Sequence, residues 1–346
     1  MSLRTTYRAR APLRVSFAGG GTDVPPYPER EGGAVLSSTI SSYAYATLRP
    51  REDGVVAVQS LDVRDQVDFD VADPIVLDGR LDLPKAAIAG VMRLRGARRS
   101  SGFDLFLHTG APPGSGLGSS SAVIVAVIAL VSAHLGVELT PHEVAEVAAR
   151  LEREDLGIRG GLQDQYAAAF GGFNFMEFHA EKVVVYPLRV PAATVHELEH
   201  NMLLAFTGSA RVGDHIIEDQ VRRFRDGEAA SLEALRMQKE IAHAMKEALL
   251  RGEVATFGSL LGEAWTQKRR MSDRIATPQI DEAIDVALRS GALGAKVTGA
   301  GGGGHMVFVC EFERKHLVAE QLIALGMSVS EFTFSRDGVT TWRVPS

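Results

Sequence analysis

Apolar and polar residues alternate in several short segments of the first half of the chain, a pattern typical of strands with one buried face. These segments are residues 11–18, 43–48, 55–59, 103–108, 173–178 and 183–186. Two longer segments have the length of helices. Residues 122–135 are almost wholly apolar and predict a buried helix, and residues 142–154 predict a second helix.

The second half of the chain has a longer hydrophobic period, typical of amphipathic helices. Helices are predicted at residues 213–225, 229–250, 253–271 and 278–290, and strands at residues 202–206, 295–297, 305–310 and 342–344. Residues 187–191 carry two prolines and mark a seam between the halves. The sequence therefore predicts an α+β protein with two domains, residues 1–188 and 189–346.

Composition narrows the class of protein. The chain has 346 residues, of which 45% are apolar and 23% charged, so disordered, collagen-like and coiled-coil classes are excluded. A net charge of −6 argues against a nucleic-acid partner. A single cysteine, Cys310, excludes an internal disulfide and fits a reducing compartment. The longest apolar run, residues 122–131, is too short to span a membrane, so we expect a cytoplasmic protein without a membrane partner. A homo-oligomer is compatible with these features.

Glycine is the one residue type in excess, with 35 copies, and it gathers at residues 19–21, 114–118 and 299–304. The middle cluster leads directly into the apolar helix predicted at 122–135. Glycines at a helix start let unpaired backbone N–H groups approach phosphate oxygens, and the adjacent serines can cap the helix or bind a metal. This cluster predicts a phosphate-binding loop, with an ordinary capped turn as the alternative.

The two familiar phosphate-binding motifs are not supported: one is matched without its structural context, and the other is absent. Gly299, Gly301 and Gly304 have the spacing of the dinucleotide fingerprint, but a predicted strand follows them instead of a helix. No Gly-Lys dipeptide occurs, so the P-loop pattern is absent. A Rossmann dehydrogenase and a P-loop enzyme are therefore not favoured.

His196 and His200 have the spacing of a zinc-peptidase motif, for which Glu218 or Asp219 could supply a third ligand. Pro191 lies just upstream and a predicted strand follows, which leaves little helix to hold two metal ligands. We expect a solvated polar connector at this place.

Three segments together carry a family resemblance. Residues 112–121, with the pattern P-x-x-x-G-L-G-S-S-S, residues 11–15 and residues 298–304 resemble the three motifs of the GHMP small-molecule kinases, in the family's order. The resemblance implies an N-terminal domain like ribosomal protein S5 domain 2, a ferredoxin-like C-terminal domain, and ATP bound between them. It assigns ATP to the residues of the central motif: Pro113, Gly114, Ser115, Gly116, Leu117, Gly118, Ser119, Ser120 and Ser121.

Residues 18–24, 160–172 and 337–342 are similar to those of the heptose 7-phosphate kinases within this superfamily. Galactokinases carry Glu-His where this chain has Gly20 and Gly21, which argues against galactose. The resemblance implies an ATP-dependent kinase that phosphorylates the C1 hydroxyl of D-glycero-α-D-manno-heptose 7-phosphate, toward GDP-heptose or a heptose natural product. A fucokinase-like 1-kinase, and a sensor that binds sugar and ATP without turnover, are the alternatives.

Phosphoryl transfer to a hydroxyl requires positioned ATP, neutralised phosphate charge and a proton acceptor. By resemblance, Asp164 is the catalytic base and Arg14 its partner. A helix-capping Asp and a solvated strand-edge Arg are the alternative interpretations. Mg²⁺ is expected on Ser120 and Glu152, with Glu154 and Asp155 as rivals of Glu152.

The resemblance also implies that the acceptor sugar contacts Asp23, which would accept hydrogen bonds from ring hydroxyls. Further expected contacts are Gly20, Gly21, Thr22, Gly301 and Gly302. A phosphorylated acceptor also requires a cationic anchor. By resemblance Arg211 is the first choice, followed by Lys268 and Arg269.

Overall fold

The computed structural model describes residues 5–95, 101–209 and 213–345, and within them the chain forms two β-sheets with helices packed on both. The larger sheet has the order β12-β1-β2-β5-β3-β4, and β6 joins it by pairing with β2 and β7. Its strands are β1 (Thr5–Ala18), β2 (Gly33–Pro50), β3 (Val55–Ser60), β4 (Asp65–Asp70), β5 (Phe103–Thr109), β6 (Phe173–Phe178), β7 (Val183–Pro187) and β12 (Thr340–Pro345). Among these pairings only β3 with β5 is parallel.

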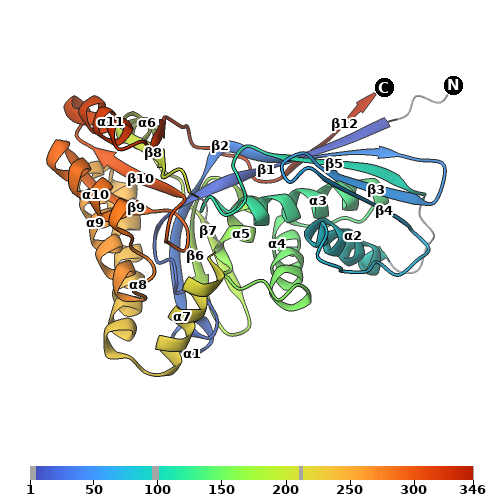
Figure 1. Cartoon of the computed structure of the whole chain (residues 1–346), viewed down its shortest axis with the longest axis horizontal. Coiled ribbons are helices and arrows are strands. Elements are labelled where there is room, and N and C mark those ends of the chain that lie inside the picture. The colour runs from blue at the N-terminus through green and yellow to red at the C-terminus, as the bar shows by residue number, and fades with distance from the viewer. Residues whose placement is uncertain (1–4, 96–100, 210–212, 346) are drawn as a thin grey trace.

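The helices of the first half are α1 (Tyr27–Glu31), α2 (Asp82–Arg95), α3 (Ser119–Leu135), α4 (Pro141–Arg150) and α5 (Gln163–Phe170). Among them, α3 and α5 pack on this sheet, α2 packs on α3, and α4 packs on both α3 and α5 (Figure 1). Helix α3 lies against β1, β2 and α2, and its aliphatic side chains are almost all buried in one core. Helix α4 begins with a capping box between Thr140 and Glu143 and ends in a π-helical turn, Leu151–Asp155. The apolar composition of α3 therefore fixes the position of the loop at its start.

The second sheet is antiparallel, with the order β11-β8-β10-β9. Its strands are β8 (Met202–Phe206), β9 (Ala292–Val297), β10 (His305–Cys310) and β11 (Ser328–Ser330). The helices of this part are α6 (Ala192–Asn201), α7 (Asp214–Arg225), α8 (Ala229–Arg251), α9 (Val254–Arg270), α10 (Pro278–Ser290) and α11 (Lys315–Ala324), with a 3-10 turn at Phe312–Arg314. Helix α9 packs on β9, and α8 reaches back to β2, so the two parts share an extensive contact.

The C-terminal segment returns to the first sheet. The Ser41 N–H donates to the Thr333 carbonyl at 2.8 Å, and the Gly172 N–H donates to the Ser335 carbonyl at 3.1 Å. Strand β12 then pairs antiparallel with β1. The predicted strand at 342–344 is confirmed, but it belongs to the sheet of the first half. The sheets change between β7 and β8, beside the predicted seam, and the domain limits 1–188 and 189–346 stay a prediction.

Most predicted elements are confirmed, and the structure contains several that were not predicted. These include the helices α2 and α5, at residues 82–95 and 163–170, and the strands β4 and β11. The predicted polar connector around His196 and His200 is wrong, because Pro191 is the N-cap of α6 and so starts a helix there. Within the described residues no cluster of three or more His, Cys, Asp or Glu side chains has a metal-binding arrangement. No helix in the described part of the chain is long and apolar enough to cross a membrane.

Candidate active site

All three glycine clusters line one cavity, which we call the central cavity. Thr298 Oγ1 donates to the Gly116 carbonyl at 2.9 Å, and the His305 N–H donates to the Ser115 carbonyl at 2.8 Å. A Cβ on Gly299 would lie 2.6 Å from Gly116 Cα, so no side chain fits at that contact. The predicted strand after the third cluster is confirmed as β10, and the glycines serve a close approach of two loops.

Residues 112–121, which we call the serine loop, enter helix α3 through a run of left-handed glycines. Gly114, Gly116 and Gly118 have φ values of 73°, 83° and 72°, and Gly118 is the N-cap of α3. No side chain caps this helix start, so its first N–H groups and the positive end of the helix dipole remain available to an anion. The loop residues that line the central cavity are Gly114, Gly116, Gly118, Ser119, Ser120 and Ser121.

The remaining residues assigned to ATP do not line the central cavity. Ser115 and Leu117 are buried beneath the loop, where the Leu117 carbonyl accepts the Arg14 N–H at 3.0 Å. Pro113 lines a neighbouring cavity instead. These residues position the loop backbone, and ATP contacts by their side chains stay a prediction.

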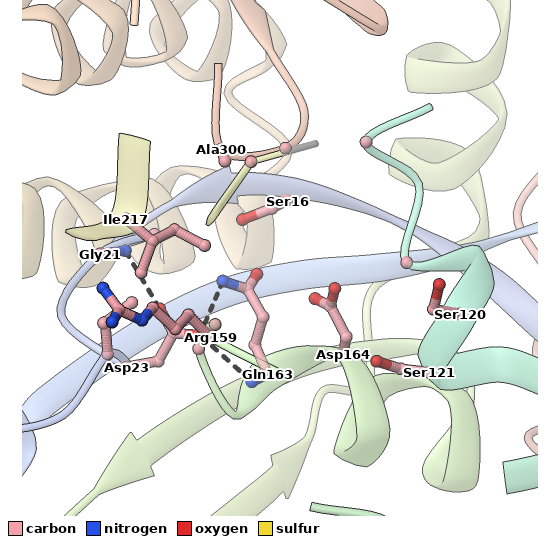
Figure 2. A pocket seen from close by; sticks show the side chains of 18 of the residues that line it. Ser16, Gly21, Asp23, Ser120, Ser121, Arg159, Gln163, Asp164, Ile217 and Ala300 are labelled. Carbon is pink, nitrogen blue, oxygen red and sulfur yellow. Dashed lines mark hydrogen bonds between the residues drawn. The ribbon is translucent and has the colours of Figure 1, made fainter. Parts of the chain in front are cut away.

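Arg14 and Asp164 meet directly under the serine loop. Arg14 Nε lies 2.7 Å from Asp164 Oδ1 and Nη2 lies 2.8 Å from Oδ2, while Nη1 donates to the Gly116 carbonyl at 2.6 Å. Arg14 is buried on β1, and Asp164 lies in the first turn of α5. Figure 2 shows the Asp164 carboxylate between Gln163 on one side and Ser120 and Ser121 on the other. The structure thus brings together the predicted base, its partner and the serine loop.

Glu152 lies on the wall of the central cavity, in the π-helical turn that ends α4. Ser121 Oγ donates to Glu152 Oε2 at 2.8 Å, and Gln165 Nε2 donates to the same oxygen. Burial raises the pKa of this carboxyl above its ordinary value. The rivals point elsewhere: Glu154 is exposed, and Asp155 pairs with Arg93 at 2.6 Å.

A magnesium ion fits this group of oxygens. A buried carboxylate held by neutral donors and an exposed hydroxyl, Ser120, both line the cavity beside the helix start that would face phosphates. Mg²⁺ prefers such oxygen ligands and completes its shell with phosphate and water. Ser121 was not predicted as a positioning residue for Glu152, because the hydrogen bond joins elements 31 positions apart in the sequence.

The first glycine cluster places Asp23 and Thr22 in different surroundings. Asp23 Oδ2 accepts from the Gln163 N–H at 3.2 Å and from Gln163 Nε2 at 3.0 Å, and Oδ1 accepts from the Gly21 N–H at 3.0 Å. Asp23 lines the central cavity, as do Gly20 and Gly21. Thr22 does not, because its hydroxyl is buried and bonded to the backbone of Gly19 and of Ala34.

Of the two predicted phosphate anchors that the structure describes, Lys268 and Arg269, Lys268 lines the cavity. Its side chain is buried, and this burial lowers its pKa to about 8, while Asp23 and Asp164 oppose the shift and Arg14 adds to it. Arg269 pairs with Asp281 at 3.1 Å on the surface. Arg211 lies outside the described residues. Gly301 lines the cavity, whereas Gly302 donates its N–H to the Ile275 carbonyl at 2.8 Å and lies behind it.

Sequence reasoning missed a second buried lysine. Lys296 on β9 donates from Nζ to the Ser16 carbonyl at 2.7 Å, and burial lowers its pKa well below the ordinary value, with Lys268 and Arg14 adding repulsion. A lysine in an apolar strand is the only sequence signal. Gln163, which holds Asp23, was missed as well, although it is adjacent to Asp164.

A loop that offers helix N–H groups to phosphates, beside a carboxylate held by an arginine, is the site of a phosphoryl-transfer enzyme. The chain matches the GHMP kinases N terminal domain over residues 82–172 and the GHMP kinases C terminal family over residues 245–326. It belongs to the GHMP kinase family, whose members are ATP-dependent phosphotransferases, and the family and fold expected from its motifs are confirmed.

The similar proteins include two of nearly the same length as this chain and one much longer protein. The chain is 38% identical over 340 residues to a D-glycero-alpha-D-manno-heptose 7-phosphate kinase of Campylobacter jejuni, covering 98% of this chain and 99% of the relative. It is similar to the crystal structure of a D-glycero-D-manno-heptose 1-phosphate kinase from Bacteroides thetaiotaomicron, with a TM-score of 0.83, 35% identity and coverage of 98% and 100%. An L-fucokinase/L-fucose-1-P guanylyltransferase of Bacteroides fragilis is 28% identical, and the match covers 87% of this chain and 34% of that relative.

Proposed function

We propose that this protein is an ATP-dependent sugar kinase that transfers the γ-phosphoryl group of ATP to the anomeric C1 hydroxyl of D-glycero-α-D-manno-heptose 7-phosphate. The observation that carries the proposal is the full-length similarity to heptose phosphate kinases, together with the pairing of Arg14 and Asp164 under the serine loop. The names of the two relatives differ in the position of the phosphate that the acceptor carries. We choose heptose 7-phosphate as the acceptor, because its C1 hydroxyl carries no phosphate and is free to react.

Separate groups of the site carry out proton acceptance, positioning and charge neutralisation in phosphoryl transfer. Asp164 accepts the proton of the C1 hydroxyl as its oxygen attacks the γ-phosphorus, and Arg14 holds the carboxylate in place with two hydrogen bonds. The helix start at Gly118 stabilises negative charge on the phosphates. Ser120 and Glu152 would hold Mg²⁺, which supplies neutralisation of phosphate charge when bound. The new O–P bond replaces the bond from the γ-phosphorus to ADP.

A second cavity adjoins the serine loop on its other side and gives a place for the nucleoside. Ser119 and Ser120 line both cavities, so a triphosphate at the helix start can extend from one into the other. Apolar side chains suited to a purine ring line the second cavity, namely Leu81, Leu83, Leu107 and Val123. We assign the adenosine of ATP to this cavity.

The acceptor is tested by ADP release from the purified full chain with Mg-ATP. D-glycero-D-manno-heptose 7-phosphate, the unphosphorylated heptose, L-fucose and D-galactose are compared by kcat/KM in parallel. The proposal predicts the highest value for the heptose 7-phosphate. A higher value for fucose would favour the fucokinase-like alternative, and binding without ADP release from any sugar would favour the sensor.

A further inference from the structure

A groove rich in arginine continues from the central cavity beyond Asp23. The two share a wall that includes Val24, Ile158, Arg159 and Ile217, so they communicate without an intervening element. Arg222 and Arg225 of α7 line the groove but not the central cavity. We call this the arginine groove. It lies at the end of the site away from the serine loop, as the order Ser120, Asp164, Gln163, Arg159 across Figure 2 shows.

The acceptor needs a cation at that end. With its C1 hydroxyl at Asp164, the sugar ring extends along Gln163 and Asp23. The C6–C7 tail leaves the ring at C5, across the ring oxygen from C1, and its two carbons can carry the phosphate away from the reacting hydroxyl. A phosphate dianion on C7 therefore arrives where Arg159 lines the wall. Arginine binds phosphate through a planar fork of N–H donors, which suits this position.

Among the described residues, the other arginines near the site are already engaged, apart from Arg225. Arg14 is paired with Asp164, and Arg153 donates to the Ile158 carbonyl at 3.0 Å and to the Gly161 carbonyl at 2.6 Å. Lys268 lines the central cavity but not the arginine groove. Arg222 is paired with Asp219, Asp226 and Glu228.

Arg159 is held in place by its backbone while its guanidinium stays accessible. The two bonds from Arg153 fix the loop on both sides of Arg159, and a Cβ on Gly160 would lie 2.8 Å from Arg153 Nη2. The Arg159 side chain is 54% exposed, and Nη1 pairs with Glu218 of α7 at 2.7 Å. Within the described residues its Nε and Nη2 have no partner, and neither has the Arg225 guanidinium.

We propose that Arg159 is the specificity-determining residue for the phosphorylated acceptor: it binds the C7 phosphate through Nε and Nη2, with Arg225 as a second cation across the groove. Glu218 orients the guanidinium through Nη1 and leaves the opposite edge of the fork for the phosphate. This inference rests on the proposed function. It adds the residue that distinguishes heptose 7-phosphate from the unphosphorylated heptose.

The test compares kcat/KM for heptose 7-phosphate and for the unphosphorylated heptose in the wild type, Arg159→Gln, Arg159→Lys and Arg225→Gln. Arg159→Gln should lower kcat/KM for the 7-phosphate by about 10- to 100-fold and leave the value for the unphosphorylated sugar within about threefold. Arg159→Lys should restore part of the preference because the charge returns without the fork. Arg225→Gln should cause a smaller, equally selective loss. Arg289→Gln, an exposed arginine of α10 away from both cavities, is the control and should change neither value.

An equal loss on both sugars in Arg159→Gln would overturn the inference, because Arg159 would then act on the site as a whole. An unchanged preference in that variant would overturn it as well. A wild-type protein inactive on heptose 7-phosphate would instead contradict the proposed function, so the two failures are distinguishable. Circular dichroism and thermal unfolding confirm that each variant is folded.

Discussion

Arg14 and Asp164, 150 positions apart in the sequence, form a two-point ion pair with N–O distances of 2.7 and 2.8 Å. The guanidinium uses its third nitrogen on the Gly116 carbonyl, so one side chain connects the carboxylate to the serine loop. This arrangement fixes Asp164 without covering it, since 22% of its side chain remains exposed. A carboxylate held in this way can meet the acceptor hydroxyl in one orientation.

Asp164→Asn should fold normally and lose turnover. The amide keeps the size of the carboxylate but does not accept the hydroxyl proton, so kcat should fall by about 10²- to 10⁴-fold. ADP release under saturating substrates measures the loss, and thermal unfolding checks the fold. Activity within a few fold of the wild type would show that Asp164 is not the base.

The pH dependence of kcat/KM should report Lys268. Its pKa is lowered to about 8 by burial, so the ammonium is charged below pH 8 and loses its charge above it. If this cation binds the reacting end of the substrates, kcat/KM should decline above about pH 8. Lys268→Arg keeps the charge at higher pH and should move the decline upward. An identical profile in both proteins would assign the decline to another group.

The lowered pKa of Lys268 also predicts how the free energy of unfolding depends on pH. The folded state holds fewer protons than the unfolded state between pH 8 and the ordinary lysine pKa, because the folded-state value is the lower one. The cost of burying the ammonium is present below about pH 8 and is relieved as pH rises through this window. Lys268→Met should therefore raise the free energy of unfolding at pH 7 more than at pH 10. Chemical denaturation at both pH values measures the difference, and equal effects at the two would contradict it.

Thr22→Val should reduce stability and leave the acceptor KM unchanged. The substitution leaves the Ala34 N–H without its buried partner at 3.0 Å, at a cost of about 1–3 kcal/mol. Thr22→Ser keeps the hydroxyl and is the control. A normal free energy of unfolding together with a raised acceptor KM in Thr22→Val would contradict this interpretation. Thr22 would then belong with the substrate-binding residues.

Glu152→Gln should raise the Mg²⁺ concentration for half-maximal activity by about tenfold or more, because a charged ligand is lost. Thermal stability should not decline, since burial disfavours the charged form of this carboxyl. Glu154→Gln, on the exposed side of the same turn, is the matched control. An equal Mg²⁺ requirement in the wild type and Glu152→Gln would exclude Glu152 as a ligand.

The sequence predicted the parts of the site that depend on backbone shape. The three glycine clusters could be recognised in the sequence because the structure requires glycine there. Gly118 has a left-handed backbone at a helix start, and a Cβ on Gly299 would collide with the neighbouring loop. Asp164, Arg14 and Glu152 were assigned through the resemblance to the GHMP kinases, and the structure brings all three to one cavity.

The missed residues depend on contacts between distant segments. Lys296 meets Ser16 across 280 positions, and Arg159 meets Glu218 only because α7 approaches the loop before α5. Thr22 carries a hydroxyl that could bind a sugar, but this hydroxyl is hydrogen-bonded to the backbone of Ala34 in β2. The sheet that β12 joins could not be inferred either, because strand partners are not encoded in local alternation.

The most direct test of the central claim is the structure of the product formed from heptose 7-phosphate and Mg-ATP. Phosphorus NMR of the purified product should show two phosphate monoesters, with the new phosphorus coupled to the anomeric proton, as in the 1,7-bisphosphate. A new phosphate on any other carbon, or no product from this sugar while an unphosphorylated one is turned over, would contradict the account.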